Sequence, residues 1–181
     1  MTKTHAFNVS KTDAAKRQLE TAIRLWFFSQ DPISVHTLAA AAHQVLHDLG
    51  AARGTPTILR GLGAIPDKYK ERVYKAVSSY ENFFKHGTRD PNKILNFNPD
   101  VTEAFLLDSV IMYMNLTNED VPMLSIFKAW MFLKHPQFFN PADVEKVKNI
   151  FSAAPIDFTK ISKMEFFTTF FEAFVRLGLS S

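Results

Sequence analysis

The stretch DVTEAFLLDSVIMYMNLT, residues 100–117, is apolar on nearly every side of a helical wheel. A helix that is hydrophobic all round is a buried helix, whereas a surface helix carries a single apolar stripe. We therefore expect residues 100–117 to form the buried central helix of an all-α fold.

Two polar residues interrupt this apolar helix, Asp108 and Asn115, which stand seven positions apart. A buried carboxylate must find a partner or change its pKa, and our candidate partner for Asp108 is Arg24 on the strongly apolar first helix. We favour a structural polar pair over catalysis, because acid–base chemistry needs a second group nearby.

Helical periodicity continues on both sides of the central stretch, with clear helix-start signals. Asp31-Pro32 places a capping side chain before a proline at the first helical position, and Asn140-Pro141 is a second N-cap and proline pair of this kind. Ser162 and Glu165 form a capping box, and Gly50 is the expected stop of the second helix. We predict one all-α domain over residues 1–181, with seven helices at 12–29, 32–50, 66–86, 100–117, 120–134, 141–153 and 160–177.

The composition is that of an ordinary globular chain, with 46% hydrophobic and 22% charged residues among 181. The net charge of +3 is too small to indicate non-specific nucleic-acid binding by itself. Cysteine is absent, which excludes disulfides, thiolate nucleophiles and cysteine-based zinc sites. No apolar run reaches the roughly 18 residues of a membrane helix, and no glycine-rich phosphate loop is present. We expect a cytoplasmic protein without membrane contact and without a cofactor.

The predicted helix 66–86 has one apolar face and one polar face. Cations and hydrogen-bond donors in a line of this kind can engage successive phosphates of RNA, a nucleotide or another anionic ligand. The alternative is an ordinary solvated face that ends in a histidine, where the helix dipole favours a cation. The polar face and its continuation comprise Lys68, Arg72, Lys75, Ser79, Asn82, His86 and Arg89.

Three histidines, His36, His43 and His47, share one side of the predicted second helix, beside its apolar face. His43 and His47 are four residues apart and could hold a metal between them, which would favour a metal-dependent enzyme. No HExxH or ExxH pattern supplies further ligands. We therefore expect no metal here, and interpret the stripe as one that packs or meets a partner.

The C-terminal segment concentrates phenylalanine, of which the chain has 18. A ring stripe at helical spacing usually belongs to the core, but this one is wider than a single monomer helix normally needs. The alternative function is therefore a protein-interaction scaffold that forms a homodimer through this stripe. The stripe comprises Phe166, Phe167, Phe170, Phe171 and Phe174.

A helical hairpin whose second helix ends in the pattern Asn82-x-x-x-His86 resembles the HEPN superfamily. These small all-α domains are often dimeric and occur in toxin–antitoxin and phage-defence systems and as nucleotide-binding modules. The segments DPISVHTLAAAAHQVLHDLG (31–50) and YENFFKHGTRDP (80–91) also look like those of an uncharacterised bacterial group of this kind. The resemblance covers mainly residues 12–91, and the helices of 100–177 would complete the core.

Active HEPN members cut RNA without a metal, using an arginine a few positions before the motif histidine. In this chain His86 matches that histidine and Asn82 the polar residue after the arginine, but Glu81 stands in the arginine's place. No histidine in the chain has an arginine five, six or seven positions upstream. The resemblance therefore implies a homodimer that binds RNA, a nucleotide or another anion and has no catalytic residues.

Overall fold

The computed structural model describes residues 6–54, 79–88, 90–152, 156–158 and 160–177, and every regular element in them is helical. The predicted all-α fold is therefore confirmed. Residues 79–85 are also helical and belong to the predicted helix 66–86, whose expected start lies outside the described residues. The remaining elements are α1 (Lys11–Phe27), α2 (Pro32–Ala51), α5 (Val101–Thr117), α6 (Pro122–Lys134), the 3₁₀ turn η1 (Pro136–Phe138), α7 (Pro141–Phe151) and α8 (Lys163–Leu177).

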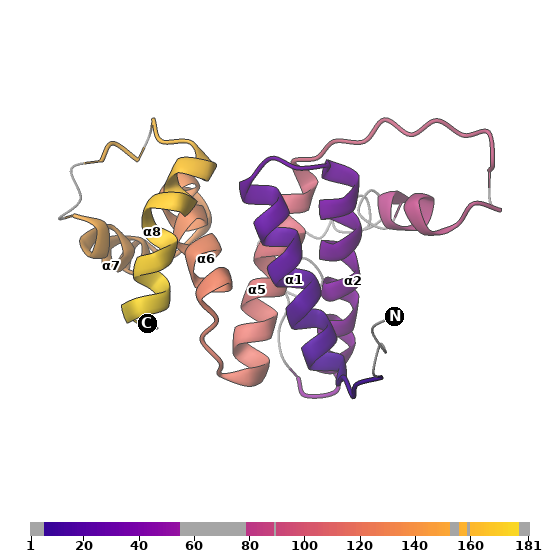
Figure 1. Cartoon of the computed structure of the whole chain (residues 1–181), viewed down its shortest axis with the longest axis horizontal. Helices are drawn as coiled ribbons and strands as arrows, with labels where there is room; N and C mark the ends of the chain where they lie inside the picture. Colours follow the sequence, from indigo (N-terminus) through magenta and orange to yellow (C-terminus); the bar gives the residue numbers. More distant parts are fainter. Residues whose placement is uncertain (1–5, 55–78, 89, 153–155, 159, 178–181) are drawn as a thin grey trace, which may run out of the picture.

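The described helices form two groups that meet where α5 lies beside α6 (Figure 1). In the first group, α1 and α2 are antiparallel neighbours, and α5 packs against both. In the second group, α6 packs against both α7 and α8, and α1 also contacts α6 and α8. None of the described helices combines the length and apolar character that are needed to cross a membrane.

Local signals set most helix ends as the sequence predicts. Asp31 accepts a hydrogen bond from the Ser34 backbone N–H at 2.8 Å, and Asn140 caps α7 in the same way. The capping box of Ser162 and Glu165 is present at the start of α8. Capping side chains accept bonds from N–H groups that the first helical turn cannot pair, which fixes where each helix begins.

Most predicted helix bounds differ from the structure by no more than two residues, and the predicted signals at Thr12 and Gly50 are not the ones that set their helix ends. The first helix begins after Ser10, which forms a capping box with Asp13, so the signal lies two residues before Thr12. Gly50 does not end the second helix, because α2 continues to Ala51 and buries Gly50 within its last turn. Shifts of one or two residues are usual at helix ends, which fray.

Helix α5 is the buried central helix, as predicted, and places nine residues in the interior. Phe105, Leu106 and Val110 are almost completely buried against α1 and α2. Burying a side chain of this size contributes about 1.5–3 kcal/mol to folding. The core of this group therefore forms around α5.

The phenylalanine stripe of α8 contributes largely to the chain's own core. The Phe167 ring lies 4.9 Å from Phe27, and the Phe166 ring lies 5.2 Å from Trp130. Phe166, Phe167 and Phe174 are buried, whereas Phe170 and Phe171 are partly buried and pack against the core. A homodimer through this stripe stays a prediction, and it would have to use the two partly buried rings.

Candidate functional site

The helical segment 79–85 is attached to the first helix group through aromatic rings. Tyr80 and Phe84 each meet Phe97 edge to face, at 5.1 and 5.2 Å between ring centroids. Tyr80 also donates a hydrogen bond to the Asn96 carbonyl at 3.4 Å. Edge-to-face contacts have preferred geometries, so this cluster fixes which side of the segment faces outward.

The outward side carries three of the predicted ligand-binding residues. Ser79, Asn82 and His86 are exposed, and the His86 N–H donates to the Asn82 carbonyl at 3.1 Å, which continues the last helical turn. The amide and the imidazole therefore lie on one face, where both can donate to an anion. Lys68, Arg72, Lys75 and Arg89 lie outside the described residues.

Glu81, which the resemblance to HEPN domains would align with the arginine of active members, forms an ion pair with Lys85 one turn further along. Its side chain is mostly buried, with 14% exposed. A carboxylate here cannot stabilise the negative charge that develops on a phosphate during cleavage, since that role needs a cation or a hydrogen-bond donor. The described part of this face thus exposes Ser79, Asn82 and His86, and the Glu81 carboxylate beside them is held in an ion pair with Lys85.

Behind this segment lies His36, which is completely buried between α2 and α5. Its Nδ1 atom lies 3.0 Å from Thr102 Oγ1, and its Nε2 atom has no hydrogen-bond partner among the described residues. Four aromatic rings surround it at 5.1–5.9 Å, those of Tyr80, Phe84, Phe97 and Phe105. Burial lowers the pKa of His36 from its usual 6.5 to about 4, so the ring is neutral at pH 7.

His43 pairs with Asp108 across the same interface, with 2.9 Å between Nε2 and Oδ2 and only 1% of each side chain exposed. The prediction that Arg24 pairs with Asp108 is therefore wrong, because Arg24 is exposed on the outer side of α1. Asn115, the other polar residue of this helix, is also exposed. The prediction that the histidines lie beside the apolar face is wrong as well, since His36 and His43 are inside the interface.

The two buried pairs have a common register. His36 and His43 are seven residues apart on α2, and their partners Thr102 and Asp108 are six residues apart on α5. Both helices rise about 1.5 Å per residue, so nearly equal spacings match when the helices run in the same direction. The nearly equal spacings are visible in the sequence, but they identify these pairs only once α2 and α5 are known to lie side by side in the same direction.

The weak metal candidates, His43 and His47, are not joined by a third ligand. His43 is bound to Asp108, and the His47 ring lies 3.4 Å from its neighbour Asp48. Within the described part of the chain no three histidine, aspartate or glutamate side chains are grouped so that they could hold a metal ion.

A cluster of charged residues that the sequence analysis missed lies where the two helix groups meet. His135 Nε2 is 3.7 Å from Glu103 Oε2, and Lys163 Nζ is 4.3 Å from the centre of the Trp26 ring. Burial raises the pKa of Glu103, against the opposing charges of His135 and Lys163, and burial lowers the pKa of Lys163. The adjoining cavity of about 120 Å³ has room for only a few waters and is smaller than a typical ligand pocket. We interpret this cluster as a structural link.

Comparison of the chain with protein-family models, with curated proteins and with solved structures finds no match.

Proposed function

We propose that this chain is a non-catalytic, HEPN-like domain that binds a phosphate-bearing anion, either RNA or a nucleotide, along the polar face of the helix ending at His86. The observation that supports the proposal is the orientation of segment 79–86. Its aromatic side is packed against His36 of α2 and against Phe97, while Ser79, Asn82 and His86 are exposed on the other side.

A rigid support of this kind favours binding, because side chains on an ordered helix lose less conformational freedom when a ligand arrives. The described donors alone are a weak anion site, since the C-terminal end of a helix carries partial negative charge. The affinity must therefore come mainly from the cations of the predicted face, Arg72, Lys75 and Arg89. This dependence makes binding sensitive to salt.

The absence of catalysis in this proposal follows from Glu81. By the sequence resemblance, Glu81 stands where active HEPN members have their arginine, and its carboxylate is engaged in an ion pair with Lys85. The expected activity is thus recognition without cleavage, and a bound RNA should be recovered intact.

Fluorescence polarisation with short labelled RNAs and nucleotides tests the proposal. The Arg72→Ala/Lys75→Ala variant should bind more weakly, and the slope of log affinity against log salt should fall by about 1.4 for two lost phosphate contacts. The matched control is Lys11→Ala/Lys148→Ala, which removes two exposed lysines elsewhere and should leave affinity unchanged. Equal affinity for wild type and Arg72→Ala/Lys75→Ala would refute the proposal.

A second candidate function, homodimer formation, is favoured by the outer face of α8. Met164 and Val175 are 49% and 54% exposed, and Phe171 lies between them at helical spacing. An apolar stripe left open on one helix is typical of a self-association surface. Light scattering after size exclusion should give the mass of a dimer for wild type and of a monomer for Val175→Glu. A monomeric wild type at all concentrations would exclude this function.

A further inference from the structure

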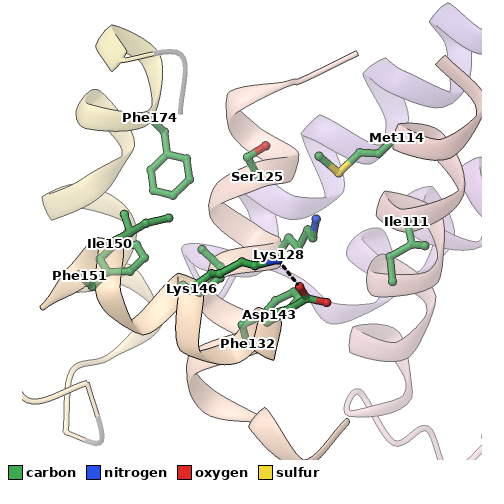
Figure 2. Close-up of a pocket in the computed structure, with 12 residues that line it drawn as sticks. Ile111, Met114, Ser125, Lys128, Phe132, Asp143, Lys146, Ile150, Phe151 and Phe174 are labelled. Atoms are coloured by element: carbon green, nitrogen blue, oxygen red, sulfur yellow. Dashed lines mark hydrogen bonds and ion pairs between the residues drawn. The ribbon is translucent and has the colours of Figure 1, made fainter. Parts of the chain in front are cut away.

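A cleft of about 420 Å³ opens between α5, α6, α7 and α8 and is lined by no residue of segment 79–86 (Figure 2). Its walls are mainly apolar. Ile111 and Met114 of α5 lie on one side of the view, and Ile150, Phe151 and Phe174 of α7 and α8 lie on the other. This volume is within the range of about 300–1,000 Å³ that is usual for small-molecule pockets.

Three charged side chains lie between these two apolar walls. Lys146 forms an ion pair with Asp143 at 3.0 Å, so these two charges balance each other. Lys128 Nζ lies 5.8 Å from the centre of the Phe132 ring, and among the described residues no acidic group is within ion-pair distance of it. The cleft therefore contains one positive charge more than negative charge.

We propose that this cleft binds a medium-chain alkyl carboxylate, with the carboxylate at Lys128 Nζ and the chain along the apolar wall of Ile150, Phe151 and Phe174. A single surplus ammonium group in an apolar surrounding matches a single negative charge on an apolar molecule. A phosphate monoester carries a charge of about −1.5 to −2 at pH 7, which is more than the single surplus positive charge of this cleft can balance. The site is independent of the phosphate-binding face proposed above.

Isothermal titration calorimetry of the full chain tests the site with octanoate, decanoate and decanol, each below its aggregation concentration. Decanoate should bind roughly tenfold more tightly than octanoate, because each buried methylene contributes about 0.8 kcal/mol. Decanol has the same chain without the charge and should bind about tenfold more weakly than decanoate.

Variants locate the site. Lys128→Gln should abolish the preference for decanoate over decanol, whereas Lys148→Gln removes a lysine of α7 outside the cleft and should change nothing. Ile150→Gln alters a residue that is 49% exposed, so the fold should persist while affinity for both ten-carbon ligands falls severalfold. The proposal is overturned if decanol binds as tightly as decanoate, or if Lys128→Gln and Ile150→Gln both bind as wild type does.

Discussion

The two helix groups are held together in different ways. Between α2 and α5, buried polar atoms are paired across the interface, His43 with Asp108 and His36 with Thr102. Among α6, α7 and α8, aromatic rings such as Phe151 and Phe166 form the contacts, and a cleft of about 420 Å³ remains between these helices and α5. Hydrogen bonds are directional and therefore fix the register of two helices, whereas apolar contacts are not directional. Paired polar atoms thus fix how α2 and α5 lie against each other, whereas the packing of α6, α7 and α8 beside α5 leaves a cleft that can hold a ligand.

The largest effect on stability is expected from breaking the buried pair of His43 and Asp108. Asp108→Ala leaves His43 buried without this partner and should lower the free energy of unfolding by about 3–5 kcal/mol. Urea unfolding measures the loss. Asn115→Ala, at an exposed position of the same helix, is the matched control and should change stability by less than about 0.5 kcal/mol.

The double variant His43→Leu/Asp108→Leu sharpens this test. Replacing both partners with apolar side chains removes the unpaired group, so the double variant should be more stable than Asp108→Ala. If the double variant is the less stable of the two, the pair does not have the structural role assigned to it.

The second prediction concerns the pH dependence of stability that the buried His36 contributes. His36 has a pKa of about 4 in the folded state and about 6.5 when unfolded, so the unfolded state binds the proton first as pH falls. Stability should therefore decrease from pH 6.5 to pH 4, by about 3 kcal/mol at 1.36 kcal/mol for each pH unit. The nearby charges of Glu81 and Lys85 act in opposite directions on this pKa.

The difference between wild type and His36→Leu isolates this contribution. Carboxylates with lowered pKa values, such as Asp13 and Glu165, also lose stabilising interactions near pH 4, but they do so in both proteins. Urea unfolding at a series of pH values should give a flatter curve for His36→Leu between pH 6.5 and 4. Identical curves would show that the folded protein binds a proton at His36 without cost.

A smaller effect on stability is expected when one alanine in each helix group is replaced by leucine, which compares the packing of the two groups. Ala42 is completely buried in α2, and its replacement by leucine should overpack the interface and cost about 1–3 kcal/mol. Ala129 lines the cleft from α6, so the same replacement has space and should be neutral or stabilising by less than about 1 kcal/mol. Thermal and urea unfolding of the pair compare the two sites. Equal destabilisation would mean that the cleft is filled in solution.

The smallest effect is expected at the link between the groups. Lys163→Met removes the cation over Trp26 and a charge near Glu103, and should cost about 1 kcal/mol. The loss should be smaller in high salt, because added ions already screen a half-buried charge. A loss above about 3 kcal/mol would show that the two helix groups depend on this link for their stability.

The sequence predicts the helices well because their signals are local. The caps at Asp31, Asn140 and Ser162 and the all-round apolar pattern of 100–117 each act within one turn or one helix. It does not predict the partner of Asp108, because a helical wheel contains no information on the rotation and register of a neighbouring helix. The cleft is hidden for the same reason, since its volume depends on how four helices are spaced.

The most direct test of the account is an amide nitrogen–proton NMR spectrum of the labelled full chain, recorded with a short RNA and then with decanoate. We predict that the RNA shifts the amides of residues 79–88 and leaves those around Lys128 and Ile150 in place, and that decanoate has the reverse effect. An RNA that binds without moving any amide in 79–88 would contradict the account.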